Sequence, residues 1–85
     1  MVLDIGNSAH KHGLTDEEIE YAIRHNWNSE LMQGNGTTPT VMIVGPRHQG
    51  ALKHDAVEIG VEMQPDKNMH VFHAMPVTSR WLHLL

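Results

Sequence analysis

The sequence predicts one α+β domain over residues 1–85, with two short N-terminal helices packed on one face of an antiparallel sheet of three to four strands. Two observations support this prediction. A helix start signal lies near residue 15, and hydrophobicity alternates with a period of two after residue 39, so the expected order of elements is α-α-β-β-β. The length of 85 residues suits a single domain.

Both expected helices lie at the N-terminal end of the chain. The segment "SAHKHG", residues 8–13, predicts a short first helix that starts as early as Leu3 and ends at Gly13. Thr15 and Glu18 form a capping box that predicts the start of the second helix. Apolar residues then recur at helical spacing and form one face, which consists of Ile19, Ala22, Ile23 and Trp27.

A loop and three strands are expected in the rest of the chain. "NSELMQGNGTTP", residues 28–39, interrupts both periodicities and predicts a loop. The expected strands are "TVMIVG" (40–45), "HDAVEIGVEM" (54–63) and "MHVFHAM" (69–75, up to Pro76), with "QPDKN" (64–68) as the last hairpin connection. Alternation places Val57, Ile59, Val61 and Met63 on one face of their strand, and Glu58 and Glu62 on the other. The apolar end "WLHLL", residues 81–85, is expected to cover the sheet, extend it, or bind a partner.

Composition narrows the class of protein. The net charge of −4 with neutral histidines argues against the strongly basic surface of a typical nucleic-acid-binding domain. The chain has no cysteine, so it forms neither disulfides nor thiolate metal sites, and a reducing cytoplasm is the expected location. We find no signal peptide and no membrane span, and we expect no cofactor and no membrane contact.

The eight histidines do not predict a metal site. His10 and His12 are two residues apart and do not share a helix face, whereas His70 and His73 are expected to point to opposite faces of a regular strand. Without cysteine, a zinc site would need three or four ligands from separate elements. We therefore predict that no metal is bound.

Two segments carry residues suited to phosphate chemistry. "GPRHQG", residues 45–50, places Arg47 beside His48, which suits phosphate binding with proton transfer, although it is equally an ordinary polar turn. His73 lies near the end of the last strand, a few residues before Arg80. Pro76 ends strand pairing there, where side chains are presented to a groove.

Several segments together resemble a known family. "SAHKHGLTDEEIEYAI", residues 8–23, is similar to the "KHG" segment and capped helix of BrnT-type toxins, which are small RelE-like ribonucleases of bacterial type II toxin–antitoxin systems. "VMIVGPRHQG" resembles the hairpin of that family, and "VFHAMPVTSRW", residues 71–81, its last strand. The resemblance implies a metal-independent endoribonuclease. For such an enzyme we predict His73, Arg80 and His48 as catalytic residues, because histidine suits proton transfer at neutral pH, and Arg47, Lys11 and His12 as phosphate-binding residues. Met75 and Pro76 stand where the family carries basic residues.

The resemblance leaves an alternative open. A catalytically weakened toxin-like protein would act as a protein–protein interaction module, because its acidic balance leaves little affinity for phosphates. Its expected partner is an antitoxin-like small protein or a second copy of the chain, whereas the ribonuclease would bind RNA. The interface would contain Trp81, Leu82, Leu84 and Leu85, whose other expected role is to close the small core.

Overall fold

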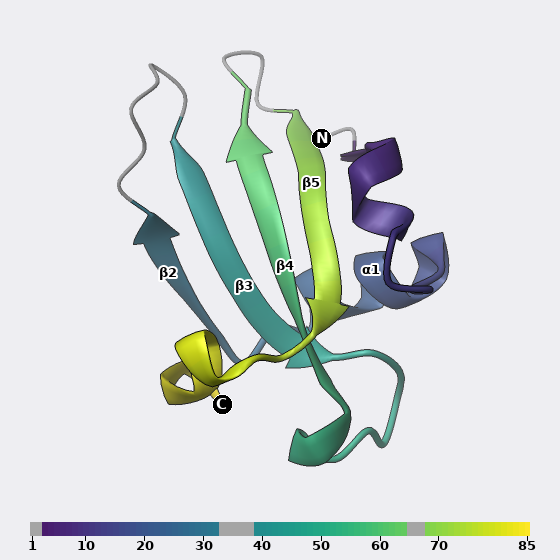
Figure 1. Ribbon diagram of the computed structural model, residues 1–85, viewed down its shortest axis with the longest axis vertical. Coiled ribbons are helices and arrows are strands. Elements are labelled where there is room, and N and C mark those ends of the chain that lie inside the picture. The colour runs from purple at the N-terminus through teal and green to yellow at the C-terminus, as the bar shows by residue number, and fades with distance from the viewer. Residues whose placement is uncertain (1–2, 33–38, 65–67) are drawn as a thin grey trace.

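The computed structural model describes residues 3–32, 39–64 and 68–85. These residues form a five-stranded mixed sheet with the strand order β1-β5-β4-β3-β2 (Figure 1). Its strands are β1 (Leu3–Ile5), β2 (Asn28–Met32), β3 (Thr40–Pro46), β4 (Ala56–Met63) and β5 (Met69–Pro76). β1 is parallel to β5, and the other neighbouring strands are antiparallel. The predicted fold of two helices on an antiparallel sheet of three to four strands is therefore wrong, because the described chain is richer in strands and has one helix longer than six residues.

The predicted first helix is instead a strand and a short turn. β1 is followed by the 3-10 turn η1 (Asn7–His10), whose start has no side-chain cap. The extended conformation of β1 is stabilised by pairing with β5, and the Gly6 amide then donates to the Val71 carbonyl at 2.9 Å. Gly13 does adopt a positive φ of 82°, as glycine allows at this position.

The predicted loop over residues 28–39 is partly a strand. β2 pairs with β3 along its whole length, but it is an edge strand with four exposed side chains out of five, so its sequence has no buried face to detect. Residues 33–38, with the "GNG" sequence, and residues 65–67 of the expected "QPDKN" connection lie outside the described residues.

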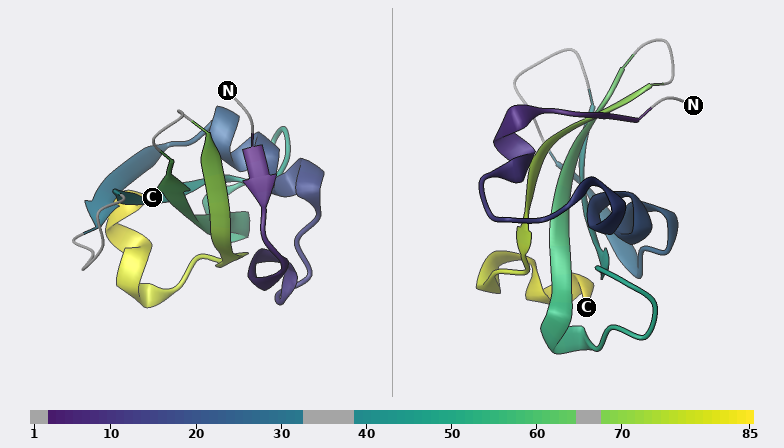
Figure 2. Two further views of the ribbon diagram at one scale, coloured as in Figure 1. Left: turned by 90° about the horizontal axis from the view of Figure 1, so that it is seen from above. Right: turned by 90° about the vertical axis from the view of Figure 1, so that its right-hand side faces the viewer.

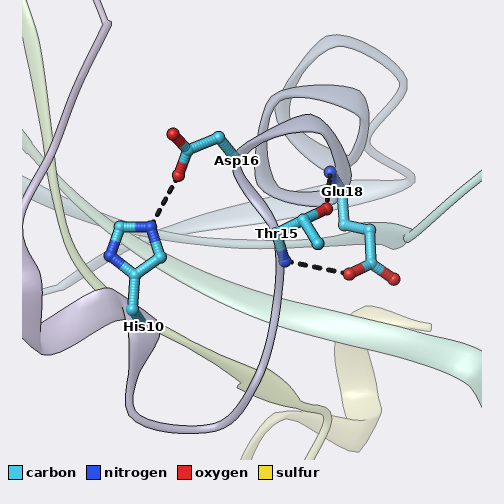
Figure 3. Close-up of polar contacts among 4 residues, drawn as sticks. All are labelled: His10, Thr15, Asp16 and Glu18. Atoms are coloured by element: carbon cyan, nitrogen blue, oxygen red, sulfur yellow. Dashed lines mark hydrogen bonds and ion pairs between the residues drawn. The ribbon is translucent and has the colours of Figure 1, made fainter.

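The predicted capped helix is confirmed as α1 (Asp16–Arg24). The Glu18 amide donates to Thr15 Oγ1 at 3.1 Å, and the Thr15 amide donates to Glu18 Oε1 at 2.9 Å (Figure 3). His10 Nε2 lies 2.6 Å from Asp16 Oδ1, which ties η1 to the first turn of α1 (Figure 3). The reciprocal cap satisfies two of the backbone N–H groups that every helix start leaves without partners.

The main core lies between α1 and one face of the sheet. Ile19 and Ala22 of α1 are fully buried against alternate residues of the three long strands, β3, β4 and β5. The predicted inward face of residues 57–63 is confirmed, because Val57, Ile59 and Val61 are buried in this core and Met63 packs against it. Trp27 does not continue the apolar face of α1. It lies beyond the end of the helix and packs against a second cluster.

That second cluster covers part of the opposite face. The C-terminal 3-10 turn η3 (Ser79–Leu84) buries Trp81 and Leu84 against Met42 and Val44 of β3. Figure 2 shows α1 and η3 on opposite sides of the sheet. Residues 81–85 thus cover the sheet, which was one of the three expected roles. Among the described helices, none is both long and apolar enough to cross a membrane.

Gly45 allows α1 to approach β3 closely. A Cβ at this position would lie 2.7 Å from the Ala22 carbonyl oxygen and 3.0 Å from Asn26 Cα, and both are backbone atoms that a rotamer change cannot move. We expect Gly45→Ala to lower the free energy of unfolding by about 1–3 kcal/mol, measured by urea denaturation followed by circular dichroism. Ser29→Ala on the exposed strand β2 is the control, with a change within about 0.5 kcal/mol. Equal effects of the two substitutions would contradict the close approach.

Candidate functional site

A groove of about 270 Å³ lies on the face of the sheet that carries η3, the face turned toward the viewer in Figure 1. Strands β2, β3, β4 and β5 contribute to its lining, and so does the segment after β5. The lining combines polar groups with apolar and aromatic side chains, namely Met32, Met42, Glu58, Phe72, His73, Met75, Thr78, Arg80 and Trp81. A groove with a few convergent polar groups among apolar walls is typical of a binding or active site.

Glu58 is the polar centre of this groove. Its side chain is only 3% exposed, and it is the only buried charged residue in the described chain. Thr78 donates twice to Glu58 Oε1, from its amide and from its hydroxyl, each at 2.7 Å. The other oxygen, Oε2, lies 2.8 Å from His73 Nε2. These three contacts compensate the carboxylate for its loss of hydration.

The contact with Glu58 orients His73. An ionised carboxylate only accepts hydrogen bonds, so Nε2 of His73 carries the proton and Nδ1 has a free lone pair when the ring is neutral. The His73 side chain is 31% exposed, so this second nitrogen belongs to a ring that solvent reaches. A histidine oriented by a buried carboxylate is the arrangement that serves as a general base in many enzymes.

A β-bulge places His73 on the groove side of the sheet. Val71 pairs with Val61 whereas His73 pairs with Gly60, so Phe72 is an extra residue in β5. The expectation that His70 and His73 point to opposite faces assumed a regular strand and is wrong, because the bulge turns both toward the face away from α1. Phe72 packs over Gly60, where an added Cβ would lie 2.9 Å from its ring. Bulges often re-aim side chains in this way beside functional sites.

Cationic and imidazole groups gather around His73. The ring of His12, which follows η1, has its centroid 6.5 Å from that of His73 in an edge-to-face arrangement. Lys11 is the exposed neighbour of His12 in the chain. Arg80 also lines the groove, and its guanidinium lies 5.4 Å from the centroid of the Trp81 ring. The site therefore holds two imidazoles, one buried carboxylate and one guanidinium.

The remaining predicted site residues lie elsewhere. Arg47 donates from Nε to the Asp55 carbonyl at 3.1 Å, and His48 Nδ1 lies 3.0 Å from the Gln49 carbonyl. Both interactions stay within the connection between β3 and β4, which contributes no residue to the groove. The structure thus brings His12, His73 and Arg80 to one face and keeps Arg47 and His48 in a separate loop.

The four apolar residues proposed for a partner interface divide into two groups. Trp81 and Leu84 are buried in the second cluster, and Leu85 is half-buried against it. Leu82 is 50% exposed. Closing the core is therefore what Trp81 and Leu84 do in this chain, and Leu82 is the member of the set that faces solvent.

Sequence reasoning did not identify Glu58 as a residue of the candidate site. Alternation placed it on the polar face of its strand, and its partner His73 lies diagonally across on the neighbouring strand. Sequence reasoning also did not identify Thr78 as a hydrogen-bond donor to Glu58. The detectable signal was a histidine-rich strand beside a glutamate-bearing strand in one hairpin, but the bulge that sets their register leaves no local pattern.

Nowhere in residues 3–32, 39–64 and 68–85 do three or more His, Asp or Glu side chains gather as a metal site requires.

Comparison of the chain with protein-family models, curated proteins and solved structures found no match.

Proposed function

We propose that the chain is a metal-independent ribonuclease, the activity that its resemblance to BrnT-type toxins implies. The observation that carries the proposal is the pair of histidines at the groove. His73 is held by the buried Glu58, and the ring of His12 lies 6.5 Å away. Cleavage of RNA without a metal requires a base and an acid on either side of one phosphate, and histidine serves both roles near neutral pH.

In the proposed reaction His73 is the base. Its Nδ1 accepts the proton of the ribose 2′-hydroxyl, since Nε2 is engaged with Glu58. The 2′-oxygen then forms a bond to phosphorus while the bond from phosphorus to the 5′-oxygen breaks. Protonated His12 donates its proton to that leaving oxygen, so the products are a 2′,3′-cyclic phosphate and a 5′-hydroxyl. Glu58 acts as a positioning residue that stabilises the charged His73 ring.

Lys11 and Arg80 supply positive charge for the phosphate. Both are exposed. Arg80 lines the groove together with His73, and Lys11 is the neighbour of His12 in the chain. Preorganised cations stabilise the charge that develops on the phosphate oxygens in the transition state. Phe72 and Met75 give the groove apolar walls on which a nucleobase can stack. The proposal places the chain in the cytoplasm, where such a substrate occurs.

The test is cleavage of a fluorescent single-stranded RNA by purified protein at low salt with EDTA. We expect a 2′,3′-cyclic phosphate product and no cleavage where the scissile ribose is replaced by deoxyribose. His73→Ala and His12→Ala should each lower the rate by about 100-fold or more. The wild-type rate should pass through a maximum with pH, and His12→Ala should lose one limb of that profile because the acid is missing.

His54→Ala is the matched control, because His54 is an exposed histidine of η2 (Lys53–Asp55) outside the groove. Its rate should equal that of the wild type. Intact RNA with a folded wild-type sample, or a His73→Ala variant as active as His54→Ala, would overturn the proposal.

A second candidate function is a toxin-like interaction module without activity. The net charge of −4 favours it, because few basic residues are present to neutralise a phosphate backbone. The RNA assay separates the two candidates. Absence of cleavage together with a stable complex with an antitoxin-like protein, or with a concentration-dependent dimer, would support the module.

A further inference from the structure

Among the described residues, α1 covers only part of the face of the sheet on which it packs. α1 spans nine residues and crosses β3 and β4 near one end of the sheet, whereas β4 and β5 are each eight residues long. The right-hand view of Figure 2 shows α1 against the lower part of this face, with no second helix of the described chain beside it. The sequence suggested two helices here, and the structure has one.

Apolar side chains continue across this face beyond α1. Leu31 of β2 lies opposite Val41 of β3, and both therefore share one face of the sheet. Met63 of β4 lies opposite Met69, which in turn lies opposite Leu3 of β1. Ile5 of β1 lies opposite Val71 and shares this face with Leu3. We call the incompletely buried apolar residues of these strands on this face the helix-side strip, which consists of Leu3, Ile5, Leu31, Val41 and Met63. Leu31 is 69% exposed, the highest value among the large hydrophobic residues described.

A groove of about 350 Å³ lies between α1 and the β1 end of the strip, where Leu3 and Ile5 line it. Leu3, Ile5 and Met69 form its wall on the sheet side, and Ile23 forms its apolar wall on α1. The polar rim comes entirely from α1, with Asp16, Glu20 and Arg24. An apolar floor with a charged rim is the usual anatomy of a protein interface.

The charge of α1 determines the kind of partner that suits this face. α1 contains the acidic residues Asp16, Glu17, Glu18 and Glu20, against Arg24 as its one basic residue, so the net charge of the helix is −3. Within the rim, Arg24 Nη2 lies 2.7 Å from Glu20 Oε1, and Asp16 Oδ1 lies 2.6 Å from His10 Nε2. A second copy of the chain would bring another acidic helix to this face, and like charges at an interface are unfavourable. A basic partner is complementary.

We propose that the helix-side strip is the docking surface for a basic amphipathic helix of a partner protein. The bound helix lies beside α1, about 10 Å from its axis, with its apolar face on the strip and its Lys and Arg side chains toward the acidic rim. This second helix completes the layer of helices over the sheet. The strip and the His73 groove are on opposite faces, so the proposal does not depend on ribonuclease activity.

The experiment uses a fluorescein-labelled helical peptide with leucines at i, i+3, i+4 and i+7 and lysines or arginines on its flanks. Fluorescence anisotropy should show saturable binding to the full chain. A peptide with the same leucines and glutamate flanks should not bind. In methyl NMR spectra, the basic peptide should shift Leu3, Ile5, Ile23 and Leu31, and should leave Met75 in the opposite groove unchanged.

Matched variants separate docking from general attraction. Leu31→Ser should weaken binding about tenfold, as expected for loss of one apolar anchor, whereas Leu52→Ser should not, although Leu52 is 63% exposed. Glu20→Lys should weaken binding more than Glu30→Lys, which changes the net charge equally at β2, where Glu30 contacts His83 across the other face of the sheet. Circular dichroism checks that each variant is folded.

Several results would overturn the proposal. One is equal binding of the basic and acidic peptides, and another is an equal loss of affinity in the two leucine variants or in the two glutamate variants. A third is self-association of the wild type that Leu31→Ser abolishes, because the occupant would then be a second copy. Failure of the RNA assay would affect none of these readouts.

Discussion

Trp81→Ala is expected to lower the free energy of unfolding by about 3–5 kcal/mol, a large part of the stability of a domain of this size. Trp81 is 6% exposed and packs with Met42, Val44, Ala56 and Leu84. Its removal would leave a cavity under η3 and expose the sheet beneath. Urea denaturation followed by far-ultraviolet circular dichroism measures the change, and Trp81→Phe should show a smaller loss because an aromatic ring remains.

Leu82→Ala is the matched control for that substitution. Leu82 follows Trp81 in η3 but is 50% exposed, so the change should stay within about 0.5 kcal/mol. If Trp81→Ala instead left the monomer as stable as Leu82→Ala and dissociated an oligomer, Trp81 would be an interface residue. The comparison therefore decides between the two roles that the sequence allowed for the C-terminal segment.

Glu58→Ala is expected to lower the free energy of unfolding by about 2–4 kcal/mol, measured by urea denaturation. The substitution removes an acceptor that binds the amide and the hydroxyl of Thr78 and the ring of His73. The Thr78 amide would then be a half-buried donor that has lost its partner, which lowers stability.

Glu58→Gln should cost less stability than Glu58→Ala while still altering His73. The amide oxygen of the new side chain can accept from Thr78, but its NH₂ group would face His73 Nε2 and favour the tautomer with the proton on Nδ1. Nitrogen-15 NMR of the imidazole detects that change. Glu62→Gln on the same strand is the control, because Glu62 accepts from Gln64 and lies opposite His70. An unchanged His73 tautomer in Glu58→Gln would contradict the orientation inferred for the site.

The bulge at Phe72 explains how this site arises from an unremarkable hairpin. In a regular strand that kept Phe72 in the pairing, His73 would share the face of Val71 and point toward α1, where Val71 and Ala74 now pack in the main core. With it, His70 and His73 both lie on the groove face, opposite Glu62 and Gly60. Gly60 supports the bulge because it leaves space for the Phe72 ring. One inserted residue thus determines which groups can meet.

The elements that the sequence alone determined are those with local signals. The capping box of Thr15 and Glu18 requires only residues three apart, and α1 begins where it predicts. The alternation of Val57, Ile59 and Val61 requires only one buried face, and β4 has that face. In both cases the conformation is selected by residues that are close together in the chain.

Only the tertiary structure decided the rest, because the deciding contacts join residues far apart in the chain. Leu3–Ile5 is a strand because β5 offers a free edge about 66 residues later, and β2 is a strand because β3 pairs with it although few of its side chains are buried. Glu58, His73 and Thr78 became one site through the bulge and the return of the chain after Pro76. A backbone hydrogen bond to a distant strand leaves no periodic pattern in the sequence. The strand content and the composition of the site therefore could not be predicted from the sequence.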